Sequence, residues 1–479
     1  MSDYNPSKID KRIPSLIISV MLLTLFFLSY LALTSQTIIF HDSLSYQSIA
    51  EMFVKNKWLE YFITGPSREP LYSILVSLSM RLAQWQSVNY LSIQIILQMI
   101  ILLISQYLTY RLLKKLQISD KICAVILAYM GVSPAMVSSG LILFSEILTY
   151  PIILWLILAV SKSWLQLKTC SRTQTILNAL NFSIPALLII LIKGSFELII
   201  PCILLPFFFL LLKALKEKNK LTARNAFIFL VAVTAMWYLP VAAYKFTNKH
   251  FNGLYVFTNR GSDALYGNTS RRMLPLSSQR LQSALAYMVG PDACSDLFKQ
   301  NCVAWSHLPS DLIGQDKIHT LIKQGLSKSQ INKTLIKETT PIALKNPFQY
   351  VFLSIIEGSK VLFWEAPEIA YVIYPDAIDK IYNASWFKYS LRCLVAFLSA
   401  GVLILGMLSI WRNKSKILNS NNISDEKYIY HCFICLLILT FTVIHSIFFI
   451  LPRYALPIAP LFLTLIAWQF EMIARKKRQ

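Results

Sequence analysis

Long uninterrupted apolar runs constrain the fold of this 479-residue chain more than any other feature. Many of them reach about 20 residues, the length at which a helix crosses the ~30 Å hydrocarbon layer of a membrane. Helices are expected because a segment in lipid must satisfy its own backbone hydrogen bonds. Only 15% of the residues are charged, where a soluble protein carries about 25%. The sequence therefore predicts an all-α polytopic membrane protein.

The apolar runs predict about ten transmembrane helices. With approximate bounds, these cover residues 13–36, 90–113, 120–142, 143–161, 176–193, 196–213, 225–244, 387–411, 428–450 and 454–472. Lysines and arginines gather at alternate ends of these runs, which by the positive-inside rule places both termini in the cytoplasm. The same clustering accounts for the net charge of +22. A nucleic-acid partner is not expected, because no basic soluble module is recognisable in the sequence.

The spans divide the chain into three regions. Residues 1–244 form an N-terminal membrane region with seven spans and a first outer loop at 37–89. Residues 245–386 form an outer, periplasmic loop region, and residues 387–479 form a C-terminal membrane region with three spans. This division places the long polar stretch of the chain on one side of the membrane.

Residues 347–366 of the outer region combine an apolar run with two charged residues, Glu357 and Lys360. The apolar run favours a membrane span and the charges oppose it. If this piece alone crossed the membrane, the basic loop at 412–416 would face outward, against the positive-inside rule. We therefore expect a juxtamembrane helix that does not fully cross.

Several shorter segments have helical patterns. Residues 43–62 mix apolar and polar positions at helical spacing, which predicts one amphipathic helix at the interface. The apolar piece at 70–84 is short for a span and carries Arg81, which predicts an interfacial or re-entrant helix. In the outer region a single apolar stripe predicts a small, mainly helical cap. Its members are Ile318, Leu321, Ile322, Ile331, Leu335 and Ile336.

Two cysteines, Cys294 and Cys302, lie in the predicted outer region. Their spacing allows a disulfide-closed loop in an oxidising compartment, and the alternative is two unpaired thiols. Cys432 and Cys435 form a CxxC inside a predicted span without a second pair, so apolar packing is expected there. The sequence shows no GxGxxG after a strand, no Walker loop and no His-rich metal cluster. The chemistry must therefore come from isolated ionisable groups.

Ionisable groups at or within a membrane are costly and are functional candidates by default. Seven of them fall at the outer ends of the predicted spans or in outer loops, which indicates a shared polar cavity. They are Asp42, Arg68, Glu69, Glu146, Lys193, Glu197 and Arg453. A carboxylate such as Asp42 can accept a proton from a hydroxyl or an amine. Arginine and lysine can hold and neutralise a phosphate. This combination suits glycosyl transfer from a lipid-phosphate sugar.

Most of these residues also have a structural interpretation. Asp42 would only cap the interfacial helix that follows it. Arg68 and Glu69 would form a surface ion pair. Lys193 and Glu197 would neutralise each other across one helical turn.

The two ionisable residues at span ends, Glu146 and Arg453, also have a structural interpretation. Glu146 would cap or snorkel at a span end, and Arg453 would anchor its span at the headgroups.

A secondary transporter or a lipid-linked glycan flippase is a different functional class, but transporters tend to show internal repeats, and none is evident here. An inactive relative that serves as an assembly partner is a third possibility for the whole protein.

Several short motifs follow one another along the chain in a distinctive order. They are Asp42 with Tyr46 and Ala50, Arg68-Glu69-Pro70-Leu71-Tyr72, Ser145-Glu146, Lys193-Gly194, and Arg453-Tyr454-Ala455-Leu456-Pro457-Ile458-Ala459-Pro460. In order and in common face, this set resembles the GT-C superfamily of polyprenyl-phosphate-sugar-dependent glycosyltransferases. Its members include protein O-mannosyltransferases and aminoarabinose transferases of lipid A. The resemblance covers most of the chain in topology.

The resemblance implies a multi-pass enzyme of the bacterial inner (plasma) membrane, a hexosyl- or pentosyltransferase that works with inversion. Its donor would be a polyprenyl-phosphate-linked sugar, and its acceptor a glycolipid, lipid A, a surface polysaccharide or a protein. Asp42 would be the catalytic base. The substrate-binding residues would be Arg68, Glu69, Tyr72, Glu146, Lys193, Arg453 and Tyr454. The family often has a second acid directly after the first, where this chain has Ser43. A divalent metal therefore stays an open alternative, and no cofactor is assigned.

Overall fold

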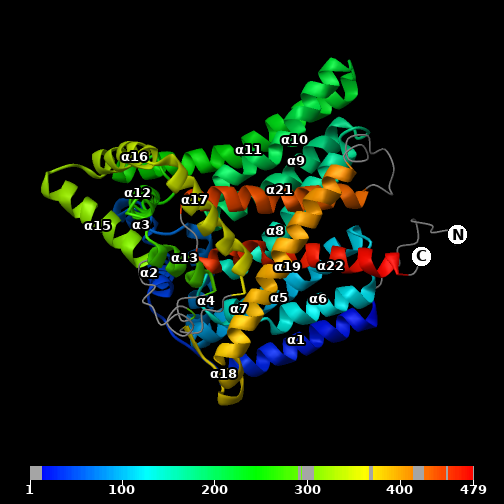
Figure 1. Ribbon diagram of the computed structural model, residues 1–479, viewed down its shortest axis with the longest axis horizontal. Helices are drawn as coiled ribbons and strands as arrows, with labels where there is room; N and C mark the ends of the chain where they lie inside the picture. The colour runs from blue at the N-terminus through cyan, green and yellow to red at the C-terminus, as the bar shows by residue number, and fades with distance from the viewer. Residues whose placement is uncertain are drawn as a thin grey trace.

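Long apolar helices build most of the molecule, as the computed structural model in Figure 1 shows. The structure describes residues 13–289, 293, 307–365, 371–413, 426–448 and 451–477. Within these residues, nine helices are long and apolar enough to cross a membrane. A tenth crossing results if the bent pair α6 (Asp120–Val132) and α7 (Pro134–Leu141) is one span. The prediction of an all-α polytopic membrane protein is confirmed.

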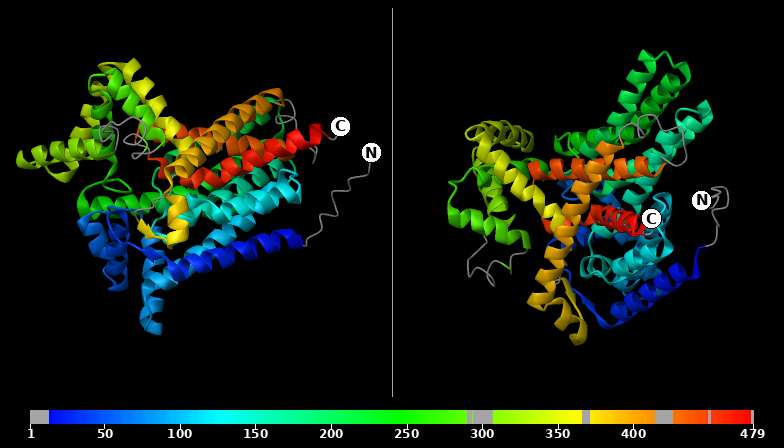
Figure 2. Two further views of the ribbon diagram at one scale, coloured as in Figure 1. Left: turned by 60° about the horizontal axis from the view of Figure 1, so that its bottom comes forward. Right: turned by 45° about the vertical axis from the view of Figure 1, so that its right-hand side comes forward.

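The nine long segments agree with the predicted runs. They are α1 (Ser15–Thr34), α5 (Tyr90–Lys115), α8 (Glu146–Gln166), α9 (Arg172–Ile192), α10 (Phe196–Lys216), α11 (Lys220–Asn252), α19 (Ser385–Arg412), α21 (Glu426–Ile447) and η6–α22 (Pro452–Ile458 and Ala459–Lys476). Burial separates the centre from the edge: 67% of the most apolar stretch of α8 and 78% of that of η6–α22 are buried, against 22% for α1. Figure 2 shows α1 along one edge of the bundle, in agreement with its low buried fraction.

The start of α1 and the end of α22 lie at one end of the bundle, which we call the terminus end (Figure 1). Ion pairs and hydrogen bonds join the loops there: Lys115 Nζ lies 3.1 Å from Glu426 Oε1, and the Ser119 N–H donates to Glu471. The opposite end, the distal end, carries most of the shorter elements. These are α2 (Asp42–Val54), α3 (Trp58–Thr64), α4 (Pro70–Gln86), α12 (Gly261–Arg272), α13 (Ser278–Val289), α15 (His307–Lys323), α16 (Lys328–Leu344), α17 (Pro347–Gly358), η3 (Ser359–Phe363) and α18 (Asp376–Tyr382).

The predicted amphipathic helix at 43–62 is two helices, so the prediction of one continuous helix is wrong. The chain breaks between α2 and α3, where Asn56 adopts a φ of +56°. Asparagine tolerates this left-handed conformation better than most residues. The break allows the rings of Phe53 and Trp58 to stack with their centroids 4.0 Å apart.

The span predicted at 120–142 is also broken, with a bend of 52° between α6 and α7. Pro134 at the start of α7 explains the bend, because proline lacks an N–H and disfavours helical backbone in the residue before it. The Glu365 carboxylate fills the break, accepting from the Tyr129 hydroxyl (2.7 Å), the Ser133 hydroxyl (2.7 Å) and the Ala135 N–H (2.8 Å). Glu365 is fully buried. This joint was not anticipated from the sequence.

Two further helices, α11 and α17, differ from the prediction mainly in where they end. Helix α11 continues past the predicted end at 244 and stops only before Gly253, which adopts a φ of +80° and forms the C-cap. The piece predicted at 347–366 consists of α17, whose 12 residues are too few to span a membrane by themselves, followed directly by η3.

The predicted stripe on α15 and α16 is only partly buried. Leu321, Ile331 and Leu335 pack together against Tyr266 of α12, whereas Ile322 and Ile336 are 54% and 49% exposed. Helix α12 packs against both helices and covers only one side of the stripe. Cys294 and Cys302 lie outside the described residues.

A two-stranded antiparallel ladder joins distant parts of the distal end. Strand β1 (Gln36–Thr37) follows α1 directly and pairs with β2 (Val372–Ile373). The Ile38 N–H donates to the Tyr371 carbonyl at 2.9 Å, and the Phe40 and Tyr371 rings stack with centroids 4.0 Å apart. The ladder fixes where the chain leaves the first span.

Candidate functional site

Asp42 lies between two arginines from distant parts of the chain. It is the first residue of α2, and its carboxylate forms ion pairs with Arg68, just before α4, and with Arg453 in η6. The side chains of Asp42, Arg68 and Arg453 are 22%, 15% and 9% exposed. The N-cap position of α2 is His41, and no side chain caps the helix. The alternative in which Asp42 only caps its helix is therefore wrong.

Four cations act on the Asp42 carboxylate. Burial raises its pKa, but the charges of Arg453 and Arg68, with smaller contributions from Arg260 and Lys193, outweigh burial and hold the pKa below its ordinary value. Asp42 is therefore ionised at neutral pH.

Glu146 and Lys193 form a second ion pair, with 2.9 Å between Lys193 Nζ and Glu146 Oε1. Glu146 begins α8, and Lys193 lies in the short turn between α9 and α10. Burial lowers the pKa of Lys193, but the Glu146 charge outweighs it and the net pKa is raised. Glu197 pairs instead with Lys245 of α11. The alternative in which Lys193 and Glu197 neutralise each other is therefore wrong.

Glu69 holds the turn that carries Lys193. Its carboxylate accepts the Gly194 N–H at 2.8 Å, and a Cβ atom at Gly194 would lie 3.2 Å from Glu69 Oε1 and 3.5 Å from Phe257. Glycine thus permits this close approach. Arg68 and Glu69 have different partners, so the interpretation of a mutual surface ion pair is wrong.

Tyr72 lies behind the ion pairs. Its side chain is fully buried, and its hydroxyl donates to Gln98 at 2.6 Å. Its ring meets the ring of Tyr46 edge-on at 4.9 Å. The structure therefore gives Tyr72 a supporting position and does not expose it to a substrate, contrary to expectation.

Aromatic rings position the cations of the site. The Arg68 guanidinium lies 5.5 Å from the Tyr46 ring centroid, and the Tyr46 hydroxyl is hydrogen-bonded to Ser145 at 2.9 Å. Lys193 Nζ lies 5.7 Å from the Tyr454 ring centroid, and the Arg453 guanidinium lies 4.8 Å from that of Phe144. Such contacts favour a positive charge over the ring face.

Arg260 is the site residue that sequence reasoning missed. It precedes α12, next to Asn259, whose N–H donates to the Pro66 carbonyl at 2.9 Å. Phe257, in the same loop, stacks on Tyr244 at 4.4 Å. This loop therefore covers the turn that leads to Arg68. No local pattern marks Arg260, because its approach to Asp42 depends on how a long polar segment folds back.

The predicted site residues thus gather at the distal end, except that Tyr72 is withdrawn behind Tyr46. Cations surround both Asp42 and Glu146, an arrangement that favours a bound anion. Among the described residues, no group of three or more histidine, cysteine or acidic side chains is suited to hold a metal ion. This observation does not decide the question of a divalent metal, which stays an open alternative.

Comparison with known proteins adds no assignment: no protein-family model and no curated protein matches this chain. The resemblance to the GT-C superfamily consequently depends on the motifs alone.

Proposed function

We propose that this protein is an integral membrane glycosyltransferase of the GT-C type, which takes its sugar from a polyprenyl-phosphate carrier. One observation carries the proposal: Asp42 lies between Arg68 and Arg453, and Lys193 and Arg260 act on the same carboxylate. A carboxylate base surrounded by cations suits a reaction that removes a proton and releases an anion.

In the proposed reaction, the acceptor hydroxyl or amine loses its proton to Asp42 while its oxygen or nitrogen bonds to the anomeric carbon of the sugar. The bond from that carbon to the phosphate oxygen breaks, and its electron pair stays on the polyprenyl phosphate. Arg68 and Arg453 stabilise this charge through forked N–H donors, and Lys193 acts as a compact cation. Attack opposite to the leaving group inverts the configuration of the sugar.

Substrate binding would also activate the base. In the structure both arginines contact Asp42 and keep its pKa low, which makes it a weak base. A bound phosphate competes for the same guanidinium groups, and its negative charge raises the pKa of Asp42. The carboxylate becomes a competent base only when the donor is in place.

The orientation follows from charge. The terminus end carries the basic residues at the helix ends, for example Lys114, Lys115, Lys213, Lys216, Arg475 and Lys476. By the positive-inside rule we place this end in the cytoplasm and the site on the outer face of a bacterial inner membrane. The helices α12, α13, α15 and α16 would then select a glycolipid, lipid A, polysaccharide or protein acceptor.

Mass spectrometry of surface glycolipids and proteins, from cells with and without the gene, tests the proposal. We expect a hexose, pentose or aminosugar mass to disappear without the gene, and also in cells that carry Asp42→Asn at normal membrane abundance. Identical glycans in all three would contradict the proposal. If purified protein moved a lipid-linked sugar across vesicle membranes without a covalent product, a transporter or flippase would be supported instead.

A further inference from the structure

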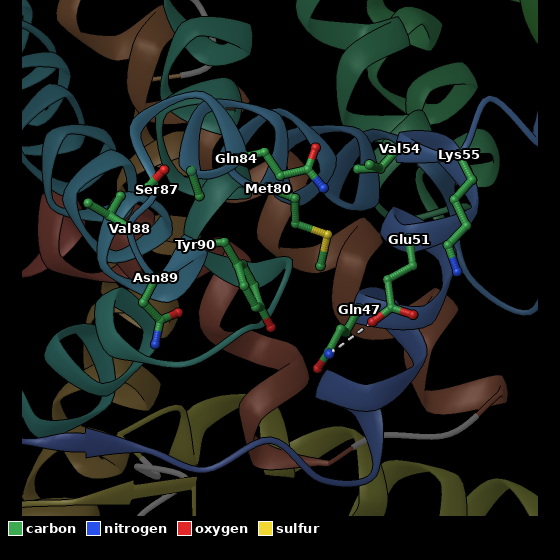
Figure 3. A pocket seen from close by; sticks show the side chains of 11 residues that line it. Gln47, Glu51, Val54, Lys55, Met80, Gln84, Ser87, Val88, Asn89 and Tyr90 are labelled. Carbon is green, nitrogen blue, oxygen red and sulfur yellow. Dashed lines mark hydrogen bonds between the residues drawn. The ribbon is translucent and has the colours of Figure 1, made fainter.

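A pocket lies on α2, separate from the Asp42 site. Its volume is about 480 Å³, and it is an open pocket lined by the second half of α2, the end of α4 and the start of α5. Figure 3 shows Gln47, Glu51 and Lys55 on one side, and Met80 and Tyr90 on the other. The lining includes none of the ion-paired residues around Asp42.

Its surroundings place the pocket at the edge of the membrane. Tyr90 begins the span α5, and Trp85, near the end of α4, is 80% exposed. Tryptophan and tyrosine are enriched where hydrocarbon gives way to the headgroup layer. Val88 is 48% exposed in the connecting turn and extends the apolar surface. The pocket therefore lies at the depth of phospholipid headgroups.

The pocket wall presents charges of both signs. Glu51 and Lys55 lie one helical turn apart, and both are exposed. Glu51 accepts a hydrogen bond from Gln47 Nε2 at 3.1 Å. In the described part of the chain, neither Glu51 nor Lys55 has an ion-pair partner. Both charges are therefore available to a ligand.

Beneath these charges the pocket is apolar. Met80 and Ala83 are 8% and 4% exposed and form much of the inner wall together with Val54. A ligand that fits must carry a positive and a negative group a few ångströms apart, joined to hydrocarbon.

We propose that this pocket binds a zwitterionic phospholipid of the phosphatidylethanolamine type. The Lys55 ammonium meets the phosphate, and Glu51, oriented by Gln47, accepts from the ethanolamine ammonium. The first part of the acyl chains lies over Met80 and Val88. A purely anionic headgroup would leave Glu51 without a cationic partner. The bound lipid would brace α2, which begins at Asp42, against α4 and α5. This inference does not depend on the proposed glycosyltransferase function.

The test uses the purified full chain in detergent, titrated with dihexanoyl phosphatidylethanolamine and with dihexanoyl phosphatidylglycerol. We expect the first lipid to bind more tightly. The double substitution Glu51→Gln with Lys55→Gln is expected to weaken its binding about tenfold, because two charge-assisted hydrogen bonds are lost. The same variant should no longer distinguish the two lipids.

Lys57 and Glu60 provide a matched control, since they form an exposed ion pair at 2.8 Å outside the pocket lining. The double substitution Lys57→Gln with Glu60→Gln changes the same charges and should leave both affinities as in the wild type. Equal affinity of the wild type for the two lipids would overturn the proposal. So would a Glu51→Gln, Lys55→Gln variant that binds phosphatidylethanolamine as tightly as the wild type, or a control variant that loses as much.

Discussion

Asp42 and Glu365 are carboxylates at helix ends with opposite surroundings. Asp42 contacts two arginines and has a lowered pKa. Glu365 accepts from two hydroxyls and one backbone N–H, and burial raises its pKa despite these bonds and the smaller opposing effect of the Arg392 charge. Neutral donors satisfy the Glu365 carboxylate and hold it in the break between α6 and α7 without a ligand. Cations create a positive region that a second anion can share, so the kind of donor separates a structural carboxylate from a candidate catalytic one.

The strongest test of this difference is Asp42→Asn. Loss of a general base is expected to reduce glycosyl transfer by about 10²- to 10⁴-fold, measured as product formed per molecule of folded protein. Asp376→Asn is the matched control, because Asp376 is also the first residue of a distal-end helix, α18, and is exposed. If both substitutions had equal effects on transfer, Asp42 would have no special role.

Glu365→Ala probes the other carboxylate. Three donors would lose their acceptor, at a cost of about 1–3 kcal/mol for each buried donor left unsatisfied. We expect the free energy of unfolding to fall by about 3 kcal/mol or more, while transfer per folded molecule stays near the wild-type value. Thermal unfolding in detergent measures the first quantity.

The control for that experiment is Glu338→Ala, which breaks the partly exposed Lys317–Glu338 surface pair at 2.8 Å. Exposed pairs are worth about 0–1 kcal/mol, so the unfolding temperature should barely change. A Glu365→Ala variant as stable as this control, or one that is stable but inactive, would remove the distinction between the two carboxylates.

Arg260→Gln tests how far the positive region extends. Arg260 acts on Asp42 but forms no ion pair with another described residue, so a phosphate can engage it without breaking an existing contact. We expect binding of polyprenyl phosphate to weaken about tenfold, equivalent to ~1.4 kcal/mol. Lys323→Gln, an exposed cation at the end of α15, should leave the affinity unchanged. Equal affinities for both variants would exclude Arg260 but not Asp42 from the site.

The smallest expected effect concerns pH. Because the pKa of Lys193 is raised above its ordinary value of 10.5, the ammonium stays fully charged at neutral and mildly alkaline pH. It loses its proton only when the pH rises above 10.5. The lowered pKa of Asp42 keeps its charge at every pH above the ordinary value of 3.8. Affinity for polyprenyl phosphate should therefore change less than about twofold between about pH 7.5 and about pH 9.5. An alkaline loss of affinity that Lys193→Arg abolished would contradict this, because arginine stays charged.

The sequence predicts the spans well because their signal is local: apolar length alone distinguishes them. It also predicts which ionisable groups share the distal end, since topology follows from the spans. It does not predict partners across the fold, such as Lys245 for Glu197 or the Gly194 N–H for Glu69. These pairs join residues far apart in the chain, and no spacing rule connects them. The break at Pro134 had a visible signal, whereas the fit of Glu365 into that break depends on tertiary packing.

The short ladder between β1 and β2 has a mechanical consequence. Thr37 lies opposite Val372, in a strand from the last third of the chain, and Asp42 follows only a few residues later. Arg453, however, belongs to η6, which that ladder does not include. A displacement of β2 would therefore be passed through β1 to the start of α2, and it would shift the Asp42 carboxylate relative to Arg453. In the proposed enzyme, an acceptor that docks against β2 would in this way change the distance between the base and one of its cations.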